Sequence, residues 1–284
     1  MPASEASVVV ERHRLTAGGE AAFLWLNRSG SLNALDWTMI RSLETELRAV
    51  DGDPAVRVVF VVGMGRAFSA GGDLKAYLEL QADPVAFPAF LDDLHRTFAN
   101  IAGMSKPVMA LVNGVTAAGG LELLLSCDFA IAAQSARIGD AHLNFGQIGG
   151  GGSLALLPRA IGPARARELV FTGRFLTADE AADYGLVNCV VPDGKLISTA
   201  LSLAESMAEH SAAALTAAKS VMNTAWGEGT GLPIALRLER ERAALYCLTL
   251  PDSMAGLRLF SSRHDRQRES HVPQPDQKLD SSTA

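Results

Sequence analysis

The sequence predicts an α/β fold that continues into a helical C-terminal part, and three observations carry this prediction. Between Ala22 and Ala132, short apolar runs alternate with segments of helical periodicity. Glycine clusters stand where apolar runs pass into helical segments, as in loops that join strands to helices. Beyond about Pro192, long Ala-, Leu- and Glu-rich segments replace the strand signals. These patterns favour a core of strands and helices followed by helices alone.

Short apolar runs predict the strands of this core. The clearest is Arg57–Val62, which is rich in β-branched residues, typical of a strand buried on both faces, and which Gly63 ends. The other predicted strands are Ala22–Leu26, Pro107–Val112, which the turn dipeptide Asn113-Gly114 closes, and Phe129–Ala132.

Helical segments separate and follow these strands. Leu35–Val50 has helical periodicity with its charges on one face, and Ala118–Ser126 continues the glycine cluster before it. Three further helices are predicted in the C-terminal part, over Leu196–Glu209, Ala213–Trp226 and Pro233–Leu248. We therefore divide the chain into an α/β core (1–195), a helical region (196–260) and a polar, loosely attached tail (261–284).

The composition excludes several classes of protein. The chain has 284 residues, 48% of them hydrophobic, and a net charge of −6, which argue against a disordered chain and against a nucleic-acid binder. Its three cysteines lack metal-ligand or disulfide-scaffold spacing. The longest apolar stretch contains Glu122, so we expect no membrane span. No secretory signal precedes the first strand, and we expect a cytoplasmic protein.

Two glycine-rich loops indicate the chemistry. They cover Gly65–Lys75 and Asn113–Glu122, and each leaves unpaired backbone N–H groups where a helix begins. If the two loops converge, these groups form an oxyanion hole, which suits a thioester carbonyl that becomes an enolate. A nucleotide-binding loop is disfavoured because Phe68 occupies the third glycine position of G-x-G-x-x-G. Tight turns alone are the remaining alternative.

Glu122 is the first candidate catalytic residue. It lies three residues after Gly119, so the two share a helix face, and leucines flank it. A glutamate there is either a costly buried charge or an acid–base group tuned by its surroundings. Because glutamate is rarely buried without a partner, we favour the functional role. A serine hydrolase is the weaker alternative, because the sequence around Ser153 falls one residue short of G-x-S-x-G.

An ordered series of motifs resembles the enoyl-CoA hydratase/isomerase (crotonase) superfamily. The central match is Asn113-Gly114-x-x-x-Ala118-Gly119-Gly120 followed by Leu125-x-Cys127-Asp128-Phe129. The resemblance runs from about Ala22 to Phe260, and further matching motifs are Phe68-Ser69-Ala70-Gly71-Gly72-Asp73-Leu74, Pro158-Arg159-x-Ile161-Gly162, Phe171-Thr172-Gly173 and Tyr184-Gly185-Leu186-Val187-Asn188.

The resemblance implies a fold, a substrate class and a set of site residues. The fold is a spiral core of ββα repeats with a C-terminal helical region used for trimerisation, as a homotrimer or a dimer of trimers. The substrate is an acyl-CoA thioester, and neither a metal nor a cofactor is implied, since coenzyme A is part of the substrate. The amides of Gly72 and Gly119 would hold the carbonyl oxygen. The residues implied to line the coenzyme A path are Ala70, Gly71, Asp73, Leu74 and Lys75.

The second glutamate of the family's hydratases falls on His142, and this is the main departure. The first falls on Glu122. His142 is an acid–base or substrate-orienting residue, a neutral pocket liner, or a residue placed there by a wrong register. Asp140, two residues earlier, is positioned to orient His142 or to act in its place. The coenzyme A contacts from the last helix also depart, with Ala255-Gly256 and Ser262-Arg263 at the matching positions.

The predicted function is that of an acyl-CoA enzyme, most simply an enoyl-CoA hydratase-type lyase. Glu122 and His142 would be its catalytic residues. The alternatives are an isomerase, an acyl-CoA hydrolase or a decarboxylase of the same superfamily, and an acyl-CoA-binding protein without catalysis. The acyl group depends on the shape of the pocket, which we expect the region Tyr77–Thr97 to influence.

Overall fold

The computed structural model describes residues 6–227 and 231–253, so the predicted tail 261–284 and the Ala255-Gly256 and Ser262-Arg263 positions lie outside the described residues. Two sheets form the core. The larger has the strand order β1-β2-β3-β5-β7-β10, and its strands pair in parallel except for β1 and β2. These strands are β1 (Val8–Arg14), β2 (Glu20–Leu26), β3 (Val56–Gly63), β5 (Val108–Val112), β7 (Phe129–Ala133) and β10 (Cys189–Val191).

The smaller sheet has the order β4-β6-β8-β9, with β8 and β9 antiparallel. Its strands have only two or three residues each: β4 (Ala67–Ser69), β6 (Val115–Ala117), β8 (Arg137–Gly139) and β9 (Leu176–Thr177). Each long strand β3, β5 and β7 is followed by one of these short strands and then by a helical segment. This repetition is the ββα core that the sequence resemblance implies, and it confirms the predicted fold class.

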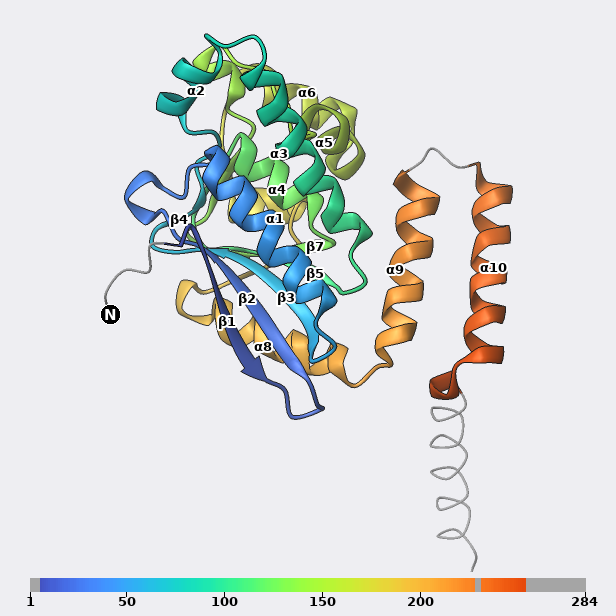
Figure 1. Ribbon diagram of the computed structural model, residues 1–284. Coiled ribbons are helices and arrows are strands. Elements are labelled where there is room, and N and C mark those ends of the chain that lie inside the picture. Colours follow the sequence, from blue (N-terminus) through green and yellow to red (C-terminus); the bar gives the residue numbers. More distant parts are fainter. Residues whose placement is uncertain (1–5, 228–230, 254–284) are drawn as a thin grey trace, which may run out of the picture.

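Helices cover both faces of the larger sheet, as Figure 1 shows. Side chains along β3 point alternately to the two faces of the sheet, and both faces are buried. Val59 and Val61 belong to the core beneath α1, α3 and α4, whereas Val58 and Phe60 belong to the core above α8. The helices of the body are α1 (Trp37–Gly52), α2 (Leu74–Leu80), α3 (Ala86–Gly103), α4 (Gly119–Ser126), α5 (Ser153–Ile161), α6 (Pro163–Thr172), α7 (Ala178–Asp183) and α8 (Leu196–Ala208). Three short 3₁₀ segments are η1 (Ser29–Ser31), η2 (His142–Phe145) and η3 (Asp193–Lys195).

The last two helices, α9 (Ala212–Gly227) and α10 (Leu232–Thr249), form a hairpin beside the body (Figure 1). Lys219 ties α9 to the body through an ion pair of 2.8 Å with Asp128 and a hydrogen bond of 2.9 Å to the Ile101 carbonyl. α10 packs against α9 and buries none of its described side chains. Within the described ranges, no helix is both long enough and apolar enough to cross a bilayer. The boundaries of the predicted regions stay predictions.

Candidate active site

The first glycine-rich loop runs from the end of β4 into α2 and is fixed by hydrogen bonds to the segment Asn33–Leu35. The Ser69 hydroxyl donates to the Asn33 carbonyl at 2.8 Å and accepts from the Gly71 amide at 3.2 Å. The Leu35 amide donates to the Gly71 carbonyl at 2.7 Å. These bonds use the hydrogen-bonding groups around the loop and leave the amide of Gly72 without an acceptor among the described residues.

The two glycine-rich loops lie in contact with each other. A Cβ atom added to Gly71, whose φ is +89°, would lie 2.9 Å from the Gly119 amide nitrogen and 2.7 Å from the Ala117 carbonyl oxygen. A Cβ atom added to Gly119 would lie 3.6 Å from the Gly72 amide nitrogen. Gly119 is the first residue of α4, and its amide has no acceptor within the described part of the chain. Two unbonded amides therefore stand side by side at the start of a helix.

Glu122 lies one turn into α4 and is 1% exposed. Its Oε1 atom accepts from the Gly151 amide at 2.8 Å and from the Ser153 amide at 3.2 Å, at the beginning of α5. The helix start stabilises a carboxylate there. A Cβ atom at Gly151 would lie 2.7 Å from Glu122 Oε2, so any larger residue there would displace the carboxylate. Sequence reasoning missed these donors, although the run Gly149–Gly152 before a helix was the available signal.

His142 is the first residue of η2, and its imidazole lies beside Glu122. His142 Nε2 lies 3.9 Å from Glu122 Oε2, and His142 Nδ1 lies 3.1 Å from Asp140 Oδ1. Burial lowers the pKa of His142, but the hydrogen bond to Asp140 and the charges of Glu122 and Asp140 outweigh it and raise that pKa above its ordinary value. Burial raises the pKa of Asp140, and His142 holds it below its ordinary value.

Tyr77, on α2, is a site residue that sequence reasoning did not single out. A Cβ atom at Gly72 would lie 2.8 Å from the Tyr77 hydroxyl oxygen, so the phenol covers the first loop. Burial and then the charge of Glu122 raise the pKa of Tyr77 to about 12, which keeps the phenol neutral. Its ring packs edge-on against Phe87 and Phe90. The sequence feature that could have identified Tyr77 is an aromatic residue in the first turn of the helix after the loop.

The residues predicted to line the coenzyme A path lie along the first loop and the start of α2. Asp73 caps α2, accepting from the Lys75 amide at 3.1 Å, and forms an ion pair of 2.9 Å with Arg28. Its carboxylate therefore has structural partners. Ala70 is anchored to the Leu32 carbonyl, and the side chains of Leu74 and Lys75 are exposed. Their contact with coenzyme A stays a prediction.

The geometry around Ser153 does not support the serine hydrolase alternative. The Ser153 hydroxyl is buried and makes no hydrogen bond to a histidine within the described ranges. Its backbone amide is instead bonded to Glu122. Nor do three or more His, Cys, Asp or Glu side chains of the described segments gather as metal ligands would.

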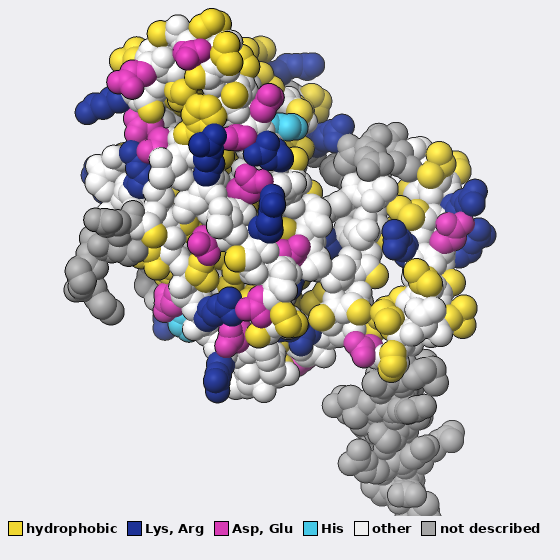
Figure 2. Space-filling view, viewed as in Figure 1, with side chains coloured by type: hydrophobic (Ala, Val, Ile, Leu, Met, Phe, Trp, Pro, Cys, Tyr) yellow, Lys and Arg dark blue, Asp and Glu magenta, His cyan; other side chains and the backbone are white. Residues whose placement is uncertain are grey.

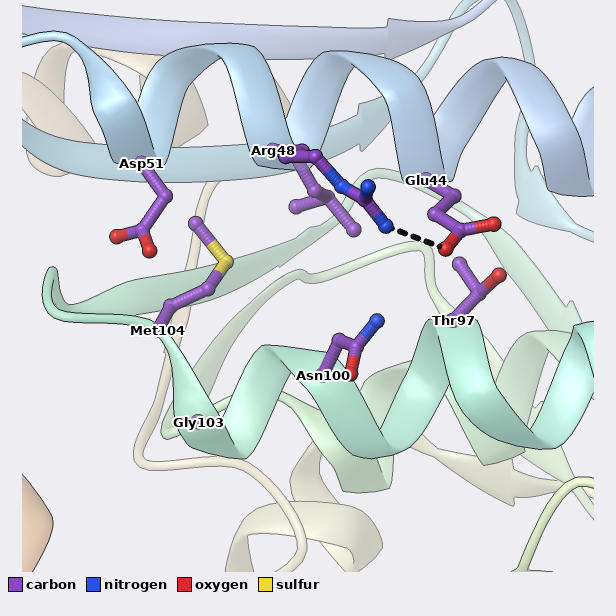
Figure 3. Close-up of a pocket in the computed structure, with 8 residues that line it drawn as sticks. Glu44, Arg48, Asp51, Thr97, Asn100, Gly103 and Met104 are labelled. Carbon is purple, nitrogen blue, oxygen red and sulfur yellow. Dashed lines mark hydrogen bonds and ion pairs between the residues drawn. The ribbon is translucent and has the colours of Figure 1, made fainter.

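A separate hollow lies between α1 and α3, with a volume of about 240 Å³, and Figure 3 shows the side chains that line it. Arg48 pairs with Glu44, one turn away on α1, at 3.0 Å, and Asp51 accepts from the Ser105 hydroxyl at 2.7 Å. These charged groups already have partners, and none of the predicted site residues lies here. The candidate active site is therefore the cluster around Glu122.

The chain is similar to known proteins along most of its length. The sequence profile described as Enoyl-CoA hydratase/isomerase matches residues 19–242. Crotonyl-CoA hydratase of Syntrophomonas wolfei is 33% identical over 84% of this chain and 90% of its own length. The 2,3-dehydroadipyl-CoA hydratase of Escherichia coli is 34% identical over 84% and 90% of the two chains. The crystal structure of an enoyl-CoA hydratase from Bacillus anthracis superposes with a TM-score of 0.82 at 32% identity, covering 90% of this chain and 96% of that one.

Proposed function

The chain belongs to the enoyl-CoA hydratase/isomerase family of enzymes, and we propose that it adds water across the double bond of a 2-enoyl-CoA thioester. One observation carries this proposal. The carboxylate of Glu122 is bound by two amides through one oxygen, while its other oxygen faces His142, and the unbonded amide of Gly119 lies one helical turn away. A base and an acid thus stand beside a place for a thioester oxygen.

The amides of Gly72 and Gly119 form the proposed oxyanion hole. They are adjacent, they have no acceptor among the described residues, and Gly119 begins α4. Negative charge that develops on the thioester oxygen is stabilised there by two N–H donors and by the start of the helix. Each donor of this kind typically contributes about 10²–10³ in kcat. The α-carbon of the acyl group then accepts a proton at the end of the reaction.

Glu122 is the proposed base. Its Oε1 atom is occupied by the amides of Gly151 and Ser153, so the proton of the attacking water is taken by Oε2. The water oxygen bonds to the β-carbon as its O–H bond breaks, and the π electrons of the double bond move toward the thioester carbonyl. His142, the second acid–base residue of the site, lies on the side of Oε2.

No cofactor is needed in this proposal, because the thioester itself makes the α-position acidic and coenzyme A arrives as part of the substrate. The loop residues Ala70–Lys75 are proposed to line its path. We also propose a homotrimer or a dimer of trimers, which the exposed apolar side chains of the α9–α10 hairpin support (Figure 2). A cytoplasmic location is consistent with three cysteines that form no disulfide.

Isomerisation is the second candidate, and one observation favours it. The two backbone amides that bind the buried Glu122 both donate to Oε1, so Oε2 of this one carboxylate is placed to take up a proton and to return it. A single carboxylate can carry a proton from one carbon to another without water. The two reactions differ in their products, so a 2-enoyl and a 3-enoyl ester distinguish them.

Replacing Glu122 by glutamine tests the proposed function. The glutamine side chain keeps an oxygen for the two amides but cannot take a proton from water. We expect kcat for hydration of crotonyl-CoA to fall by about 10²–10⁴ with little change in Tm. The assay follows loss of the conjugated thioester absorbance and identifies the product by mass.

Glu209→Gln, at the exposed end of α8, is the matched control and should keep full activity. Retained hydration in Glu122→Gln would contradict the role of Glu122. Conversion of the 3-enoyl ester without hydration of the 2-enoyl ester in the unaltered protein would decide for the isomerase.

A further inference from the structure

A buried acid stands directly behind His142, on the side away from Glu122. We propose that Asp140 is a positioning residue that holds His142 as a cationic proton donor directed at Glu122 and the substrate. This inference rests on the proposed function for its chemistry, and it goes beyond it by assigning the charge of the site. A carboxylate at position 142 would add a third negative group beside Glu122 and Asp140, whereas a protonated His142 places a positive group between these two.

The geometry of Asp140 fixes the imidazole in one orientation. Asp140 is 1% exposed, and its Oδ1 atom lies 3.1 Å from His142 Nδ1 and 3.4 Å from the His142 backbone nitrogen. A carboxylate only accepts hydrogen bonds, so Nδ1 carries the hydrogen in this pair. With Nδ1 engaged, Nε2 points toward Glu122 Oε2 at 3.9 Å. The ring therefore bridges two buried carboxylates, one through each nitrogen.

The charges around the ring favour the cation. The charged groups that act on it are Glu122 from α4 and Asp140 from the segment before η2, and the uncharged hydroxyl of Ser153, from α5, acts on Asp140. The phenol of Tyr77, from α2, faces Glu122 and is neutral. A neutral imidazole would leave two buried carboxylates without a counter-charge, which is costly in a low-dielectric site. The raised pKa of His142 agrees with this arrangement.

A cationic His142 gives the catalytic cycle a donor and a way to reset. Glu122 Oε2 takes a proton from water while the water oxygen bonds to the β-carbon. The α-carbon then takes the Nε2 proton of His142, which becomes neutral. The proton on Glu122 Oε2 finally passes to Nε2, after an approach of roughly 1 Å from the observed separation. One water is consumed and both side chains return to their initial charges.

The inference is tested first without substrate. Protein labelled with ¹⁵N-histidine is titrated by NMR, and His142→Gln identifies the His142 signal by its loss. We expect the His142 pKa to lie above about 6.5 in the unaltered protein. In Asp140→Asn it should fall by about one unit or more, a tenfold change in the protonation equilibrium. An unchanged His142 pKa in a folded Asp140→Asn variant would overturn the inference.

Activity supplies the second readout. A donor must be protonated, so kcat/KM falls as pH rises through the pKa of His142. This alkaline limb of the pH profile should move to lower pH in Asp140→Asn. Asp128→Asn removes another ion-paired aspartate, away from the site, and should leave the limb in place. An unshifted limb in Asp140→Asn would also count against the inference. Because the NMR titration needs no substrate, failure of hydration itself would overturn the proposed function separately.

Discussion

Gly71 shows how a single residue brings the two loops of the site together. Its backbone has a φ of +89°, and the space where a side chain would stand is filled by the Ala117 carbonyl and the Gly119 amide. Both features exclude every other residue type without a shift of the second loop. The conformation of one glycine thus positions the amide of another, 48 residues along the chain from it in the sequence.

Alanine at Gly71 is therefore expected to damage activity more than stability. The left-handed backbone costs roughly 1–2 kcal/mol for a residue with a Cβ atom. The contact with the Gly119 amide must also be relieved, which displaces one oxyanion donor, so we expect kcat to fall about 10²–10³-fold. Steady-state kinetics and urea unfolding measure the two effects.

Gly185→Ala is the matched control, because Gly185 has a φ of +79° and open space around its Cα atom. It should lose a similar amount of stability and keep its activity. Equal losses of activity in the two variants would mean that general destabilisation, and not the displaced amide, explains the effect.

At the scale of elements, α9 depends on one buried cation. Lys219 is 5% exposed, pairs with Asp128 and donates to the carbonyls of Ile101 and Lys106, which joins α9 to α3 and to the start of β5. The α9–α10 hairpin contributes few other buried residues to the body. Polar contacts, and not a shared hydrophobic core, therefore set the place of the hairpin, since Thr216 and Asn223 of α9 also donate to backbone carbonyls of the body.

Replacing Lys219 by methionine should loosen α9. The change leaves the Asp128 carboxylate and two carbonyls without their partner, and we expect a loss of about 3 kcal/mol. Hydrogen exchange should rise in α9 and at the α9–α3 contact before it rises in the larger sheet. Lys195→Met, at an exposed lysine, should leave both measurements unchanged. Unaltered exchange in α9 would show that other contacts hold this helix.

For the whole molecule, the exposed apolar side chains bear on the proposed assembly. Hydrophobic side chains gather over α2 and along the α9–α10 hairpin in Figure 2. On α10, Leu245 is 54% exposed and Leu248 is 84% exposed, one turn apart on the same face. Exposed apolar faces of this extent mark contacts with other chains. They support the proposed trimer.

Light scattering coupled to size exclusion tests the assembly. We expect a mass of three or six chains, each of 29.9 kDa. The double variant Leu245→Glu and Leu248→Glu should dissociate, because it places two charges on the apolar face. Ser202→Glu with Ser206→Glu, an exposed pair on α8, should keep the native mass. A single-chain mass for the unaltered protein would refute the proposed trimer.

Local pattern by itself determined much of this protein. The apolar runs predicted β2, β3, β5 and β7, and the helical periodicity predicted α1, α4, α8, α9 and α10, because burial on one or both faces leaves a periodic trace in the sequence. The spacing from Gly119 to Glu122 placed an amide and a carboxylate one turn apart, because helix geometry is local. The strands β4, β6 and β8 escaped prediction because three residues are too few to show a period.

The tertiary structure alone decided which groups meet. The amides that bind Glu122 come from residues 29 and 31 positions later, and the phenol of Tyr77 covers a glycine on the preceding loop. His142 Nε2 lies 3.9 Å from Glu122 Oε2 although 20 positions separate the two residues, whereas the contact between His142 and Asp140 is local. Contacts of this kind depend on where the ends of the strands converge, and no local pattern of residues encodes that point.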